Sequence, residues 1–184
     1  MIENLDQTIF DFLQSLRTPL LTDVMFFFTK VGNVEGIVLI LLALLLGVIW
    51  WRKKSDETYY LESWLLVTLG TALAALTQTS LKLLFSRTRP ELENILLTEV
   101  GYSFPSGHAL VSITLFFLIA YFFLKQKSGR KASALKTVLI TMPFMIGLSR
   151  IFLGVHWPSD VLGGFVFGAI IVFLVVKLDK LLRR

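Results

Sequence analysis

Five long apolar runs limit the folds that this chain can adopt more than any other feature does. They cover residues 34–51, 59–85, 107–124, 132–152 and 158–178. A helix needs about 20 mostly apolar residues to cross a bilayer, and each run approaches or exceeds that length. The chain is 55% hydrophobic with a mean hydropathy of +0.73, whereas soluble domains are about 45–50% apolar. The sequence therefore predicts an all-α, polytopic helical bundle that forms one membrane domain.

Composition also argues against several classes of function. The net charge is +5, but the basic residues lie between the apolar runs and form no continuous face, so we do not expect nucleic acid binding. The absence of cysteine excludes disulfides and cysteine-ligated metals. With only two histidines, His108 and His156, a transition-metal site is not expected either. We therefore predict no metal and no other cofactor.

Residues 1–31 permit two interpretations. Apolar residues recur there at helical spacing until Pro19 interrupts the pattern. One interpretation is an amphipathic helix at the membrane interface followed by a short helix. The other, which we favour, is a broken span or re-entrant pair. If this segment crosses the membrane once, as we expect, it makes a sixth span. We accordingly divide the chain into an N-terminal helical segment, 1–31, and a membrane-embedded core, 32–184, whose motifs lie within 82–160.

The distribution of basic residues predicts the orientation in the membrane. Basic segments follow alternate runs, at Arg52–Lys54, Lys125–Lys131 and Lys177–Arg184, and all three fall on one side. The positive-inside rule makes that side cytoplasmic, so the C-terminus is expected in the cytoplasm of a multi-pass plasma membrane protein. The loop at 86–105 and the turn at 150–160 then face the extracytoplasmic side.

Three polar clusters fall on that extracytoplasmic side. In chain order they are Lys82 with Arg89-Pro90, then Pro105-Ser106-Gly107-His108, then Ser149-Arg150 with His156 and Asp160. Ionisable residues at membrane depth are costly and indicate function by default. Taken singly, each cluster has a simpler interpretation as interface anchors, an ion pair or an ordinary helix cap. The coincidence of all three on one face favours a shared site.

The chemistry of these residues suits a phosphate group. Arginine side chains bind phosphate oxygens bidentately and lysine adds a point charge, so we expect Lys82, Arg89 and Arg150 to bind the phosphate. Ser106 and Gly107 open a helix whose free N–H groups attract anions.

The two histidines suit a transfer reaction at that phosphate. Asp160 is four residues after His156 at the start of a helix, which places its carboxylate within reach of one imidazole nitrogen. That contact would fix the tautomer and leave the other nitrogen free to attack. His108 is then available as a general acid for a leaving alkoxide.

The three clusters together resemble the signature of the type 2 phosphatidic acid phosphatase superfamily. Each signature position is matched in order, and the resemblance extends over about residues 59–180. It implies a six-helix membrane bundle that hydrolyses phosphomonoesters or diphosphates without a metal. It also implies that His156 is the nucleophile, oriented by Asp160, and that His108 protonates the leaving group. The phosphoryl oxygens would be held by Lys82, Arg89, Ser106, Gly107 and Arg150.

A site at the outer interface implies an amphiphilic substrate, either a phospholipid or a polyprenyl phosphate in the bilayer. The resemblance suggests undecaprenyl diphosphate and phosphatidylglycerophosphate. The main alternative is a lipid or anion transporter without hydrolysis, since intramembrane charges would also line a substrate path. A vanadate-dependent haloperoxidase would share the anion site, but this short, hydrophobic chain argues against it.

Overall fold

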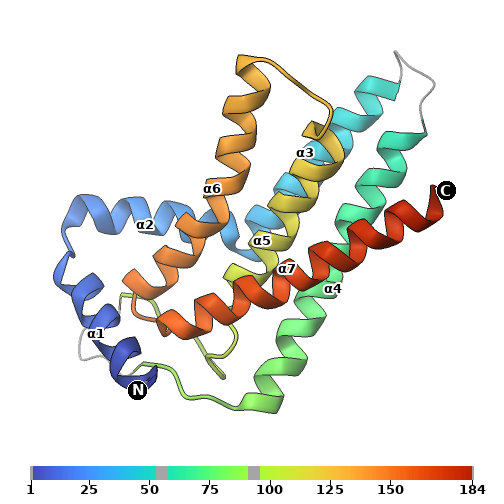
Figure 1. The fold of residues 1–184 in the computed structure, drawn as a ribbon. Helices are drawn as coiled ribbons and strands as arrows, with labels where there is room; N and C mark the ends of the chain where they lie inside the picture. The colour runs from blue at the N-terminus through green and yellow to red at the C-terminus, as the bar shows by residue number, and fades with distance from the viewer. Residues whose placement is uncertain (1, 53–57, 91–95, 184) are drawn as a thin grey trace.

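The computed structural model describes residues 2–52, 58–90 and 96–183, and every regular element in these ranges is helical (Figure 1). In chain order the elements are α1 (Ile2–Ser15), α2 (Pro19–Gly32), α3 (Val34–Arg52), α4 (Tyr59–Phe85), α5 (Gly107–Ile119), the π-helix η1 (Ala120–Leu124), α6 (Arg130–Phe152) and α7 (Pro158–Leu182). Five segments are long and apolar enough to cross a membrane: α3, α4, α5 with η1, α6 and α7. The predicted all-α membrane bundle is confirmed.

The boundaries of the spans follow the apolar runs, with one difference at the C-terminus. The helix α7 continues to Leu182, through residues predicted as a basic tail. Asp179 is buried and pairs with Arg183 one turn later, which extends the helix through the basic residues. Lys53, Lys54 and Arg184, which belong to the predicted basic segments, lie outside the described residues.

The helix α5 forms the centre of the bundle. It is apolar around its whole circumference, as a buried helix should be, and it packs against α2, α4, α6 and α7. Gly164 and Gly168 of α7 allow the closest approach, because a Cβ at either position would lie 2.7 Å from a carbonyl oxygen, that of Ser106 or Leu110 respectively. These two small residues therefore pack within the bundle. This contact brings the second and third polar clusters together.

The N-terminal segment forms two short helices. Pro19 starts α2, and the hydroxyl of Thr18 accepts the N–H of Leu21, so the chain breaks where the sequence predicts. The helices α1 and α2 have 14 residues each and are not among the five candidate spans. Figure 1 shows both near the end of the bundle where α6 ends and α7 begins. A sixth crossing by this segment stays a prediction.

The basic ends of the helices gather at the opposite end. Lys127, after η1, lies over the ring of Trp51 at 5.7 Å, and Arg183 lies over the ring of Tyr59 at 4.4 Å. The ends of α3, η1 and α7 are therefore close together. The loop between α4 and α5 and the turn between α6 and α7 lie at the other end, and these two segments and the helix ends beside them carry the polar clusters.

Candidate active site

The end of α4 and the loop after it hold two of the predicted residues. Lys82 lies in the last turn of α4, and the chain leaves the helix at Ser86, whose φ of 46° is left-handed. Arg89 follows in the loop. Its guanidinium donates to the carbonyl oxygen of Gly101 over 2.9 Å and to that of Val155 over 2.8 Å. Arg89 is thereby fixed against the turn between α6 and α7.

His156 and Asp160 form the pair that their spacing predicts. Pro158 begins α7, so His156 precedes the helix and Asp160 lies in its first turn. The Nδ1 atom of His156 is 3.4 Å from Oδ2 of Asp160, a long contact, and the same oxygen also accepts the N–H of Trp157 over 2.8 Å. A carboxylate only accepts hydrogen bonds, so it favours the tautomer with the proton on Nδ1. Nε2 of His156 then carries no proton, and its lone pair faces Nη1 of Arg89 at 3.4 Å.

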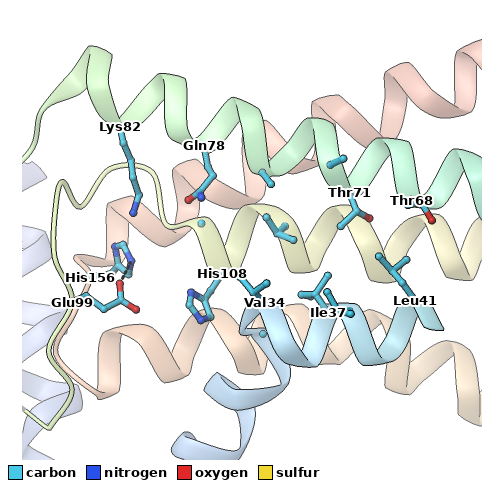
Figure 2. Close-up of a pocket in the computed structure, with 16 residues that line it drawn as sticks. Val34, Ile37, Leu41, Thr68, Thr71, Gln78, Lys82, Glu99, His108 and His156 are labelled. Atoms are coloured by element: carbon cyan, nitrogen blue, oxygen red, sulfur yellow. Dashed lines mark ion pairs between the residues drawn. The ribbon is translucent and has the colours of Figure 1, made fainter. Parts of the chain in front are cut away.

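Lys82, Arg89 and Arg150 converge near Nε2 of His156, and we call them the cation cluster. A carboxylate lies among them: Oε2 of Glu99 is 3.1 Å from Nη2 of Arg89, and Oε1 of Glu99 pairs with Arg150. The Nε2 atom of His156 is 3.4 Å from Nη1 of Arg89 and 4.0 Å from Oε2 of Glu99. Figure 2 shows Lys82 pointing toward the same place. An anionic group thus already lies in front of the imidazole.

Arg150 is fully buried and is held from α2 as well as from the loop. Its Nη1 donates to the hydroxyl of Thr29 over 3.2 Å, and that hydroxyl is 2.7 Å from the hydroxyl of Ser149. The N-terminal segment therefore contributes to the position of a residue in the cation cluster. The Nε atom of Arg150 has no hydrogen-bond partner among the described residues.

A cavity of about 370 Å³ opens beside the cation cluster (Figure 2). Its polar end is lined by Lys82, Glu99, His108 and His156, and it continues between α3 and α4 along apolar side chains. The Nε2 atom of His108 is 2.7 Å from Oδ1 of Asn33, which orients the second imidazole. The apolar part of the lining consists of Val34, Ile37, Val38, Leu41, Ala72, Ala75 and Val111.

The start of α5 is packed tightly against this cavity. Ser106 is fully buried, its N–H donates to the carbonyl oxygen of Asp160 over 3.0 Å, and its hydroxyl has no partner in the described part of the chain. Gly107 lines the cavity, and a Cβ there would lie only 1.9 Å from Oε1 of Gln78. A larger residue at position 107 would therefore displace Gln78.

The surroundings of His156 keep its imidazole neutral. Burial lowers its pKa well below the ordinary value of 6.5, and the positive charges of Arg150, Arg89 and Lys82 lower the pKa further. A lowered pKa means that the neutral ring persists at pH 7 and below. The neutral form is the one that can attack an electrophile.

The structure brings all the predicted site residues to one end of the bundle. They are Lys82, Arg89, Ser106, Gly107, His108, Arg150, His156 and Asp160. Among the residues that sequence reasoning missed, Glu99, Asn33 and Arg87 contact them, and Asp6 contacts Arg87. An acidic residue in a loop between two cationic motifs is a weak signal for Glu99. We find no sequence signal for the other three.

Known proteins share both the sequence and the fold of this chain. The family model of the PAP2 superfamily matches residues 63–184. A phosphatidylglycerophosphatase B from Bacillus subtilis (strain 168) is 29% identical and covers 100% of this chain and 87% of its own length. A putative undecaprenyl-diphosphatase from Escherichia coli (strain K12) is 28% identical over 92% of this chain and 80% of its own length.

A solved structure extends the agreement to three dimensions. The crystal structure of a transmembrane PAP2-type phosphatidylglycerolphosphate phosphatase from Bacillus subtilis matches with a TM-score of 0.80 and 27% identity, and it covers 97% of this chain and 86% of that one. The five candidate spans, the clustered motifs and these similarities agree. This chain belongs to the PAP2 superfamily, as a multi-pass membrane enzyme that hydrolyses lipid phosphate esters.

Proposed function

We propose that this enzyme removes a terminal phosphate from a membrane lipid through a phosphohistidine intermediate on His156. The observation that carries the proposal is the place of the Glu99 carboxylate. It lies 4.0 Å from Nε2 of His156 and is held by Arg89 and Arg150. A phosphoryl group has the same charge sign and the same affinity for guanidinium groups. A phosphate at this position would present its phosphorus to the free imidazole nitrogen.

The reaction proceeds in two steps. Nε2 of His156 attacks phosphorus and forms a P–N bond, while the P–O bond to the leaving group breaks and the leaving oxygen takes a proton from His108. Water then attacks phosphorus and gives a proton back to His108, and the P–N bond electrons return to His156. Asp160 stabilises the positive charge on the imidazole. The cation cluster, the free hydroxyl of Ser106 and the N–H of Gly107 hold the phosphoryl oxygens.

The substrate is amphiphilic. The cavity joins a cationic end to an apolar passage between α3 and α4, which are candidate spans with exposed leucines facing outward. A headgroup phosphate would occupy the polar end while its acyl or prenyl chain follows the passage toward lipid. Phosphatidylglycerophosphate and undecaprenyl diphosphate are the two substrates that we favour, since relatives of this chain are named for them.

The active site faces the extracytoplasmic leaflet, and the C-terminus is cytoplasmic. The support for this orientation is the separation of charges: Lys127 and Arg183 lie at the end opposite His156, and the positive-inside rule places basic ends in the cytoplasm.

Purified protein should release inorganic phosphate from both lipids at the same rate with and without a chelator such as EDTA. No step of the proposed reaction uses a metal ion. In sealed right-side-out vesicles, an added short-chain lipid phosphate should be hydrolysed without permeabilisation. Transport of the lipid into liposomes without phosphate release would favour the transporter alternative instead, and activity that appears only after permeabilisation would reverse the proposed orientation.

Replacing Glu99 with glutamine should strengthen binding of anions at the site. The substrate phosphate must displace a carboxylate that is paired with Arg89 and Arg150, and a neutral amide competes less for these cations. We expect the inhibition constant of tungstate and the KM to fall about tenfold, equivalent to about 1.4 kcal/mol. Glu62→Gln, which removes a carboxylate paired with Arg183 at the far end, is the matched control. A higher KM in Glu99→Gln would contradict this role.

A further inference from the structure

A second polar network contacts Asp160 through Oδ1, the carboxylate oxygen that does not face His156. Nη1 of Arg87 donates to Oδ1 of Asp160 over 2.7 Å, and Nη2 of the same guanidinium donates to Oδ2 of Asp6 over 2.7 Å. Arg87 therefore bridges two carboxylates. One of them orients His156 and the other comes from α1, at the opposite end of the sequence.

Several hydrogen bonds hold Asp6 in this network. The residue is 4% exposed, and its Oδ1 accepts the backbone N–H of Ser159 in the first turn of α7 over 2.8 Å. The hydroxyl of Ser159 also donates to Oδ2 of Asp6. Burial alone would raise the pKa of Asp6, but hydrogen bonds from Ser159 and Arg87 outweigh burial and lower it. The carboxylate of Asp6 is therefore charged at neutral pH.

The charge balance gives this network a consequence for the reaction. Arg87 alone would neutralise Asp160, and the imidazole of His156 would then face a carboxylate whose charge is already compensated. With Asp6 present, Arg87 is shared between two carboxylates, and the group of three carries one net negative charge. That negative charge can stabilise the ring of His156 when the ring becomes positive during phosphoryl transfer.

We propose that Asp6 is a positioning residue for catalysis, which acts through Arg87 to keep Asp160 correctly oriented and fully charged toward His156. This inference rests on the proposed function, because it assigns Asp6 a task within that reaction. It makes α1 part of the working enzyme, although α1 lies outside the region that matches the family model, residues 63–184. The N-terminal segment, residues 1–31, would therefore take part in the reaction that we propose for the core, residues 32–184.

The test compares variants of the full-length protein in the phosphate-release assay. Asp6→Asn should lower kcat about tenfold and leave KM within about twofold, because the cation cluster that binds phosphate is untouched. Asp6→Glu, which retains a carboxylate, should recover most of the loss. Asp11→Asn, on the same helix but exposed and bonded only to Gln7 among the described contacts, is the control and should behave like the wild type.

A double-mutant cycle separates this role from a purely structural one. If Asp6 acts through Arg87, Asp6→Asn should cause no further loss of kcat in an Arg87→Gln background. Independent losses that multiply would overturn the inference, as would an unchanged kcat in either single variant. If Asp6→Asn does not fold, Arg87→Gln alone still tests the inference. An unchanged kcat in that variant would show that the contact from Asp6 through Arg87 to Asp160 does not affect the reaction. Inactive wild-type protein would instead overturn the proposed function itself.

Discussion

Replacing His156 with asparagine should abolish turnover, with kcat reduced about 10⁴-fold or more. In the proposed reaction the imidazole forms the bond to phosphorus, and an amide nitrogen at that position is not nucleophilic. Asparagine can still donate a hydrogen bond toward Asp160, so the first turn of α7 should keep its structure. The lipid phosphate should still bind, since Lys82, Arg89 and Arg150 are unchanged.

The measurement pairs steady-state phosphate release with chemical trapping. Wild-type protein that is quenched with base during turnover of a radiolabelled lipid should carry label on histidine, and His156→Asn should carry none. Thermal unfolding in detergent checks that the variant is folded. Trapped label in His156→Asn, or substantial turnover by it, would remove His156 from the role of nucleophile and leave only the family membership and the fold.

Replacing His108 with glutamine should have an effect that depends on the leaving group. For a lipid phosphomonoester the leaving group is an alkoxide, which needs a proton, and loss of a general acid costs about 10²–10⁴-fold in kcat. For a lipid diphosphate the leaving group is itself a phosphate, which departs more easily unprotonated. The loss for the diphosphate should therefore be at least about tenfold smaller than that for the monoester.

The two substrates serve as each other's control, because one protein preparation is used for both. Glutamine can keep the hydrogen bond to Asn33, which limits the change to the loss of an acidic proton. Equal losses on the monoester and the diphosphate would show that His108 holds the phosphate or the helix start rather than protonating the leaving group.

Most of the fold was predictable from local properties of the sequence. The apolar runs correctly predicted where α3, α4, α5 and α7 begin. The length of apolar chain that spans a bilayer and the helical period can both be recognised within one segment. The end of α7 was not predictable in this way, because it depends on the buried Asp179 and its pair with Arg183. How the N-terminal segment meets the membrane depends on its packing against α6 and α7.

In the candidate site, too, the sequence predicted the residues that lie close together in the chain and missed those that only long-range contacts bring in. Residues with a short spacing, such as His156 and Asp160, were found because one lies just before a helix start and the other lies in the first turn of that helix. Glu99 and Asp6 were missed because their contacts with Arg150 and Ser159 join residues 51 and 153 positions apart in the sequence. Such contacts are set by the path of a loop and by helix packing, which no local pattern encodes.

The carboxylate of Glu99 has a consequence for an enzyme that is surrounded by phospholipids. An ordinary membrane phospholipid is a phosphodiester with one negative charge on its phosphate, so exchanging it for Glu99 would bring no electrostatic gain. A terminal phosphate carries close to two negative charges at neutral pH, since its second pKa is about 6. A terminal monoester phosphate would therefore displace the side chain more readily than a diester would. Glu99 would thus keep the bulk lipid of the bilayer from acting as a competitive inhibitor.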